Sequence, residues 1–374
     1  MLAAHLQQFI AMPVSRRPEV DARPFLAYAG NGPVVALGAA MAATLKDVAE
    51  RAGVSRSAVS RAFTAGASVS AGTRAKIDVA AAALGYSPNL LARSLTTRRT
   101  QLIGLVSDNF HNPVFLEVFD LFTRGLQDRG LRPLLVNLSG ATDPASSVQM
   151  LKAYSVDAVV VASSTLPPSF ALAFRDAGLP VVNSFGRAAV APGVDVVGVD
   201  NVECGRLAAR TFAARGYAEV AFLGGPERAS TTQDRLAGFL GQAQVLGLNA
   251  RHSFAAAYAF DAGRAEMQRL LQCGPLAEAY FCGDDVLSIG AMSALQDAGL
   301  SVPGDVGVLG VNDMEMAGWA NIGLTTIRQP VREIIDASLQ VIEAILRSPG
   351  HGPKAQVFGC DLVERRTLRA VVDG

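Results

Sequence analysis

Residues 44–61 read TLKDVAERAGVSRSAVSR. Thr44 and Asp47 have the spacing of a capping box, in which each side chain accepts a hydrogen bond from the other residue's backbone N–H. Apolar residues then recur at the spacing of one helix face: Leu45, Val48, Ala49 and Ala52. Gly53 follows and is suited to end a helix. The pattern therefore predicts a helix that begins after Thr44 and ends at Gly53.

Two more short helices are predicted after the first. Ser55 can cap a second helix, whose inward face would comprise Ala58, Val59, Ala62 and Phe63. A third helix is expected over roughly residues 71–84, with Gly85 at its end and three apolar residues inside, Ile77, Ala81 and Leu84. Three short helices so close together predict an all-α domain of the helix-turn-helix type.

The outward face of the second helix carries two long cations and two small hydroxyls, Arg56, Ser57, Ser60 and Arg61. Such a face suits the major groove of DNA, where arginine grips guanine with two hydrogen bonds. An ordinary solvated helix face is the alternative. The charge distribution favours the DNA-binding interpretation of this face. Residues 44–100 hold nine basic and three acidic residues, whereas the whole chain holds 33 of each. We therefore interpret residues 44–88 as a DNA-binding domain.

A fourth short helix is expected at residues 90–95, with Asn89 as its cap. Its three leucines, Leu90, Leu91 and Leu95, are unusual for a linker. They would either pack on a neighbouring domain or present Leu95 as a wedge for the minor groove once DNA orders the helix. We interpret residues 89–100 as a hinge helix and linker.

Apolar runs alternate with helical stretches from Leu102 onwards. The runs are residues 102–106, 134–138, 158–161, 181–182, 194–199, 220–223, 279–282 and 306–311. Helices are expected between them, for example at residues 201–215 and 287–298. This alternation predicts parallel sheets with helices on both faces. One large doubly wound domain and two smaller lobes would both satisfy the pattern of residues 101–374.

The four cysteines are far apart and form no C-x-x-C pair: Cys204, Cys273, Cys282 and Cys360. They are typical of small buried thiols in a reducing cytoplasm rather than of a metal site or a disulfide. No apolar run reaches the roughly 18 residues that a membrane span needs. Residues 1–43 contain one faintly signal-like stretch, which Pro33 and Gly38 interrupt. We interpret them as a disordered or mis-called extension rather than an export signal.

Sequence signatures of common enzymes are missing. The four histidines have no metal-ligand spacing, and there is no G-x-S-x-G, P-loop or post-strand G-x-G-x-x-G motif. Asp284 and Asp285 are adjacent, so on a helix they would not face each other as a general acid/base pair. We therefore expect no catalytic residue, no metal and no cofactor.

Two sets of motifs run along the chain. The amino-terminal set comprises residues 44–55, 59–61, 69–70, 73–74, 84–86, 88–89 and 92–95. The set in the body comprises residues 112–115, 199–201, 235–239, 290–292, 324–327 and 329–330. Together they resemble the lactose/galactose repressor family of bacterial transcriptional regulators, over essentially all of residues 44–374.

The resemblance implies a helix-turn-helix domain and a periplasmic-binding-protein-like body of two α/β lobes with parallel sheets. The chain would cross between the lobes three times, near Asp200, near residues 327–330 and near residue 357. A small-molecule effector, a sugar or sugar derivative, is expected in the cleft between the lobes. The protein is expected to be a cytoplasmic homodimer, with a tetramer as the alternative, on pseudo-palindromic double-stranded operator DNA. A solute-binding protein without a regulatory role and a sugar-processing enzyme are the rival classes.

The resemblance also implies contact residues. The DNA-binding positions are Thr44, Ser55, Arg56, Ser57, Ser60, Arg61, Asn89, Ala92 and Leu95. The four on the outward face of the second helix would read bases, Leu95 would intercalate, and Thr44, Ser55 and Asn89 would contact phosphate.

In the body, Arg235, Asp284 and Asn312 fall on effector-contacting positions. Asp284 stands where the family usually has Asn, and Asn312 where it usually has Asp, so the donors and acceptors are rearranged and no particular sugar is indicated. Three aromatic residues are candidates either for the walls of the site or for ordinary core packing: Phe110, Phe115 and Trp319.

Overall fold

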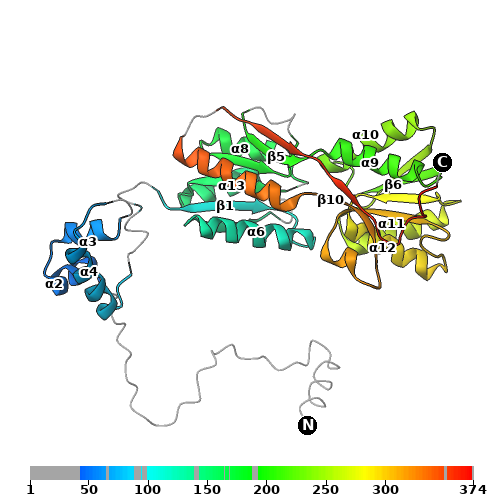
Figure 1. Ribbon diagram of the computed structural model, residues 1–374. Coiled ribbons are helices and arrows are strands. Elements are labelled where there is room, and N and C mark those ends of the chain that lie inside the picture. Colours follow the sequence, from blue (N-terminus) through cyan, green and yellow to red (C-terminus); the bar gives the residue numbers. More distant parts are fainter. Residues whose placement is uncertain are drawn as a thin grey trace, which may run out of the picture. The chain divides into compact units, whose positions relative to one another are not determined.

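The architecture is that of a computed structural model, which describes residues 43–64, 67–87, 94, 99–138, 143–163, 165–167, 169–187, 193–348 and 352–372 (Figure 1). The chain divides into a unit that ends at Pro88 and a unit that begins at Asn89. Some predictions lie outside the described residues. They are those for Asn89, Ala92 and Leu95, and the prediction for residues 1–43, of which only Ala43 is described. Among the helices of the described residues, none is both long and apolar enough to cross a membrane.

The described residues of the first unit form three helices, α2 (Leu45–Ala52), α3 (Arg56–Ala62) and α4 (Ala71–Leu84). The capping box is present at the start of α2: Thr44 Oγ1 accepts from the Asp47 N–H, and Asp47 Oδ2 accepts from the Thr44 N–H. Gly53 and Gly85 follow α2 and α4 with φ of 64° and 61°, which glycine adopts without a steric penalty. One apolar cluster joins the helices: Val48, Ala49, Val59, Ala62, Ile77, Ala80 and Ala81. The predicted helix-turn-helix domain is confirmed.

The described residues of the second unit form two separate six-stranded sheets, so the body has two lobes rather than one large doubly wound domain. In the first lobe the order is β2-β1-β3-β4-β5-β11, with β1 (Leu102–Ser107), β2 (Arg132–Asn137), β3 (Ala158–Ala162), β4 (Val181–Ser184), β5 (Asp195–Val199) and β11 (Ala355–Phe358). In the second lobe it is β7-β6-β8-β9-β10-β12, with β6 (Glu219–Gly224), β7 (Asn249–Phe254), β8 (Ala279–Cys282), β9 (Gly307–Asn312), β10 (Thr325–Arg328) and β12 (Asp361–Val363). Neighbouring strands are parallel except β10 and β12, which are antiparallel.

Helices cover both faces of each sheet, as the alternating pattern predicts. On the first sheet, one face carries α6 (Val114–Asp128) and α13 (Val331–Arg347), and the other carries α7 (Pro144–Ala153) and α8 (Ser169–Asp176). On the second sheet, one face carries α9 (Asn201–Ala213) and α10 (Ser230–Val245), and the other carries α11 (Phe260–Gln272) and α12 (Asp285–Asp297). A short 3-10 helix, η2 (Glu315–Gly318), follows β9.

The chain passes between the lobes three times. It leaves β5 for α9 at Asp200, leaves β10 for α13 at residues 329–330, and leaves β11 for β12 at residues 359–360. The last of these crossovers is the red segment between the lobes in Figure 1. The crossovers predicted near Asp200, residues 327–330 and residue 357 are therefore confirmed.

Helices α9 and α10 approach so closely that a side chain cannot be added at their contact. A Cβ atom on Gly238 of α10 would lie 1.9 Å from the Val202 carbonyl oxygen of α9. We expect Gly238→Ala to lower the free energy of unfolding by about 1–3 kcal/mol, because the two helices must separate. Gly241→Ala on the same helix is the control: no atom lies within 4 Å of its added Cβ. Urea unfolding compares the two variants, and equal stabilities would contradict this account of the contact.

Candidate effector cleft and DNA-reading helix

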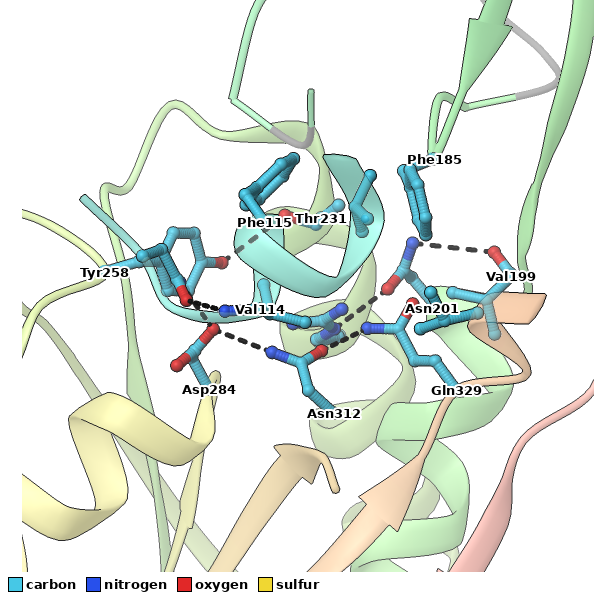
Figure 2. Close-up of a pocket in the computed structure, with 14 residues that line it drawn as sticks. Val114, Phe115, Phe185, Val199, Asn201, Thr231, Tyr258, Asp284, Asn312 and Gln329 are labelled. Carbon is cyan, nitrogen blue, oxygen red and sulfur yellow. Dashed lines mark hydrogen bonds between the residues drawn. The ribbon is translucent and has the colours of Figure 1, made fainter. Parts of the chain in front are cut away.

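The carboxyl ends of strands from both sheets converge on one cavity. Asn112 follows β1, Phe185 follows β4, Asn201 follows β5, Tyr258 follows β7 and Asp284 follows β8. Polar groups gather at such ends in open α/β sheets because the loops beyond the strands face a crevice that the helices leave uncovered. Figure 2 shows side chains from both lobes around this cavity, among them Phe185, Tyr258 and Asp284.

The cavity is lined by Asn112, Val114, Phe115, Val118, Phe185, Val199, Asn201, Thr231, Arg235, Tyr258, Asp284, Asn312, Gln329 and Val331. Its volume is about 40 Å³. Sites for drug-sized ligands measure about 300–1,000 Å³. A sugar-sized molecule can therefore enter only if the lobes or the lining side chains move apart.

Arg235 is a buried cation in the wall of the cavity. It lies on α10 with only 4% of its surface exposed. Its Nε donates to Asn201 Oδ1 at 2.8 Å, and its Nη1 donates to the Gly283 carbonyl oxygen at 2.6 Å. These bonds connect α10 to the first crossover and to the end of β8. Arg235, the predicted effector contact, thus lines the cavity and is held there by two hydrogen bonds.

Asp284 is an acceptor that joins the two lobes at the cavity. Its Oδ2 accepts from Asn112 Nδ2 of the first lobe at 2.9 Å and from Asn312 Nδ2 of the second lobe at 2.8 Å. Its Oδ1 accepts from the Val286 N–H at 2.7 Å and caps α12. Burial raises the pKa of Asp284, and the hydrogen bonds from Asn112 and Val286 oppose that rise. The exchanged residues Asp284 and Asn312 are therefore direct partners of each other.

Asp285 has a different role from its neighbour. It accepts from Thr326 Oγ1 at 2.6 Å and from the Met314 N–H at 2.8 Å, so it connects α12 to β10 and to the segment after β9. Burial raises the pKa of Asp285 well above its ordinary value, and the nearby Asp284 adds to that rise. The two carboxyls bond to separate partners and share no common target, as expected for adjacent residues at a helix start.

The second crossover also reaches the cavity. Gln329 Nε2 donates to Asn312 Oδ1, so a chain of hydrogen bonds runs from this crossover through Asn312 to Asp284 (Figure 2). Asn312 has a φ of 115°, a value that is strained for a residue with a side chain. The surrounding bonds hold it in this conformation, which directs its amide toward both partners.

Of the three predicted aromatic wall residues, only Phe115 lines the cavity. The centroid of its ring lies 6.5 Å from that of Phe185, which also lines the cavity. Phe110 stacks instead on Phe119 of α6 at 4.6 Å and belongs to the packing around the core. Trp319 follows η2 with 51% of its surface exposed and does not line the cavity.

Sequence reasoning missed several lining residues, among them Asn112, Asn201, Gln329, Thr231, Tyr258 and Phe185. The signal that could have found three of them is their place in the chain, since Asn112, Phe185 and Asn201 lie shortly after strands that the apolar runs predict.

The predicted base-reading residues lie on the solvent face of α3. Arg56, Ser57, Ser60 and Arg61 are all exposed, whereas Val59 and Ala62 of the same helix are buried. Among the described residues, neither arginine side chain has an ion-pair partner. The face is therefore free to contact another molecule.

The predicted phosphate contacts that the structure describes also act as helix caps. Thr44 Oγ1 donates to Asp47 Oδ2 at 2.8 Å, and Ser55 Oγ accepts from the Ala58 N–H at 3.2 Å. Ser55 Oγ also lies 2.9 Å from Ser57 Oγ. These hydroxyls are exposed at the amino ends of α2 and α3, where backbone N–H groups attract anions.

Comparison with known proteins covers both units. Residues 44–89 match the family described as bacterial regulatory proteins, lacI family, and residues 209–368 match the periplasmic binding protein-like domain. The HTH-type transcriptional repressor PurR of Escherichia coli O139:H28 (strain E24377A / ETEC) is 30% identical over 331 residues, which cover 87% of this chain and 97% of PurR.

Solved structures show the same arrangement. The Lac repressor dimer bound to operator and the anti-inducer ONPF has a TM-score of 0.79 and 25% identity, over 88% of this chain and 99% of that one. The complex of the transcriptional regulator CelR with cellobiose has a TM-score of 0.66 and 26% identity, over 87% and 99% of the two chains. This chain therefore belongs to the lacI family of bacterial regulatory proteins and is a DNA-binding transcriptional regulator with a periplasmic-binding-protein-like effector domain.

Proposed function

We propose that a neutral, polyhydroxylated small molecule of the sugar class binds between the lobes and sets the affinity of this repressor for its operator. The observation that carries the proposal is the hydrogen bond of 2.9 Å between Asn112 of the first lobe and Asp284 of the second. A ligand that enters the cavity competes for this bond. Its binding energy then depends on the orientation of the lobes, which is the requirement for shifting a conformational equilibrium.

The composition of the cavity supports a neutral polar ligand. One cation, Arg235, and one carboxylate, Asp284, lie among amides that both donate and accept hydrogen bonds, Asn112, Asn201, Asn312 and Gln329. Phe115 and Phe185 offer apolar surface for a ring. Hydroxyl groups satisfy such mixed partners because each one donates and accepts. The cellobiose complex of CelR is a precedent for a sugar ligand on a similar fold.

The DNA side of the proposal uses α3 and its neighbours. Arg56, Ser57, Ser60 and Arg61 read bases, Thr44, Ser55 and Asn89 contact phosphate, and Ala92 and Leu95 are further DNA contacts. Two copies of the chain bind a pseudo-palindromic operator, as in the Lac repressor dimer on its operator. Residues 44–88 form the DNA-binding domain and residues 101–374 the effector and dimerisation domain of a cytoplasmic protein that catalyses no reaction.

The test is a fluorescence anisotropy titration of the full chain with DNA from upstream of its own gene and with scrambled DNA of equal length. Glucose, galactose, lactose and cellobiose are added in separate series. We expect tighter binding to the upstream DNA and a change of about 5- to 150-fold in its Kd with one of the sugars. Equal affinity for both DNAs would contradict the proposal. Sugar binding without any DNA binding would favour a solute-binding protein instead.

A further inference from the structure

Two of the four cysteines meet where the chain passes between the lobes. Cys204 lies in the first turn of α9, directly after the first crossover, and is fully buried. Cys360 lies in the third crossover, between β11 and β12, and is partly exposed. The backbones of the two crossovers run side by side: Val199 pairs with Phe358, and the Asp200 N–H donates to the Phe358 carbonyl oxygen at 2.9 Å. This pairing brings Cys360 against the core cluster that contains Cys204, so the two thiols are close enough to influence each other's pKa.

The surroundings make the two thiols unequal. Interaction with the Cys204 thiol lowers the pKa of Cys360, and the positive charge of Arg235 lowers it further. Burial and the acidic side chains of Glu203 and Asp361 act in the opposite direction. The pKa of Cys204 is raised well above its ordinary value, first by its interaction with Cys360 and then by burial. Cys360 is also the thiol that a dissolved oxidant reaches first, because it is partly exposed whereas Cys204 is fully buried.

The other two cysteines lack this combination. Cys282 is fully buried in the second lobe, and burial raises its pKa to about 12. Cys273 is exposed at the end of α11, where Arg269 Nη1 donates to its sulfur at 3.3 Å. Among the described residues, neither Cys282 nor Cys273 forms a disulfide.

We propose that Cys204 and Cys360 are a peroxide-oxidised pair that forms a reversible disulfide across the first and third crossovers. The Cys360 thiolate attacks hydrogen peroxide, so that an S–O bond forms, the O–O bond breaks and hydroxide leaves; the sulfur is oxidised to a sulfenic acid and the peroxide is reduced. The Cys204 sulfur then attacks the Cys360 sulfur, the S–S bond forms, and the sulfenic oxygen leaves as water with the Cys204 proton.

The bond would restrict the movement that the cleft requires. It joins the start of α9 to the segment that leads into β12, so two of the three connections between the lobes move as one. The same turn of α9 carries Asn201, which accepts from Arg235 in the cavity. Oxidation therefore holds the lobes in one orientation and blocks entry into a cavity that is too small for a sugar. This consequence rests on the proposed function, whereas the oxidation itself goes beyond it.

The chemical test counts free thiols in the full-length reduced protein after treatment with hydrogen peroxide. The treated protein is denatured without reductant, labelled with a maleimide and weighed by mass spectrometry. We expect labels on two cysteines instead of four, and full labelling again after a thiol reductant. After the same treatment, the Cys360→Ser variant should carry a maleimide label on each of its three remaining cysteines. Cys204→Ser should keep a sulfenic acid on Cys360 that dimedone traps.

The matched control is Cys273→Ser, which removes the exposed thiol and should still lose two labels on oxidation. Labelling of all four cysteines in the treated wild-type protein would overturn the proposal. A disulfide that requires Cys273, or one that links two chains, would overturn it as well.

The functional arm repeats the operator titration with the same four sugars on oxidised and reduced protein. We expect oxidised protein to bind operator but to lose its response to the sugar, and a thiol reductant to restore that response. A fully oxidised sample that still responds would overturn the restriction of the cleft. If reduced protein responds to none of the sugars, the proposed function fails, while the thiol count, which needs no effector, still decides the disulfide.

Discussion

Arg235→Ala is expected to abolish the effect of the sugar on operator affinity, while binding to operator without sugar stays nearly unchanged. The arginine is buried in the cavity wall and offers several donors in a fixed geometry, which suits a hydroxylated ligand. Alanine removes these donors and leaves Asn201 Oδ1 and the Gly283 carbonyl oxygen without the partner they now have. The loss should equal the whole coupling between the two sites, about 1–3 kcal/mol or roughly 5- to 150-fold in Kd.

The measurement is a pair of operator-binding isotherms, with and without sugar, for wild type and variant. Arg215→Ala is the matched control, because Arg215 is equally buried, with 5% of its surface exposed, but donates to Glu364 and the Thr211 carbonyl oxygen away from the cavity. It should retain the response even if it lowers stability. A response of Arg235→Ala at the wild-type sugar concentration would show that Arg235 does not bind the effector.

Arg61→Ala is expected to weaken binding to the true operator by about 1–3 kcal/mol, or roughly 5- to 150-fold, with little effect on random DNA. Arg61 lies on the exposed face of α3 near the end of that helix, while Val59 and Ala62 anchor the helix in the core. A guanidinium that makes two hydrogen bonds to guanine distinguishes that base from the others, whereas a contact to phosphate does not.

Anisotropy titrations on operator and scrambled DNA measure this difference. Lys76→Ala serves as the control, because it removes the same charge from the exposed surface of α4. The control should change both affinities alike, if it changes them at all. If Arg61→Ala weakens binding to both DNAs equally, Arg61 contacts the phosphate backbone of the DNA and does not read a base.

The three helices of the first unit could be predicted from the sequence because their signals are local. The capping box of Thr44 and Asp47 joins residues three positions apart, and Gly53 and Gly85 end helices through their own backbone conformation. The apolar spacing that selects Val59 and Ala62 for the core also leaves Arg56 and Arg61 on the outside. Each of these features depends on neighbours within about one helical turn.

The apolar runs of the body predict most of its strands but not all of them. The eight apolar runs all correspond to strands, but β7, β10, β11 and β12 were not predicted. β7, β11 and β12 lie at sheet edges and carry exposed residues, so they lack a continuous apolar run. β10 is buried but begins with Thr325 and Thr326, whose hydroxyls find partners on distant segments, among them Asp285. The hydropathy of the residues around a threonine does not indicate whether its hydroxyl has such a partner.

The sequence by itself determined the helix-turn-helix domain and the α/β character of the body, and its resemblance pointed to Arg235, Asp284 and Asn312, which line one cavity. Only the tertiary structure decided that the body has two sheets, that Phe115 lines the cavity while Phe110 and Trp319 do not, and that Asn112 belongs to it. Asn112 and Asp284 are 172 residues apart yet share a hydrogen bond. A polar residue after a strand looks the same in sequence whether it faces solvent or a cleft, because sheet order and the crossovers decide which strand ends meet.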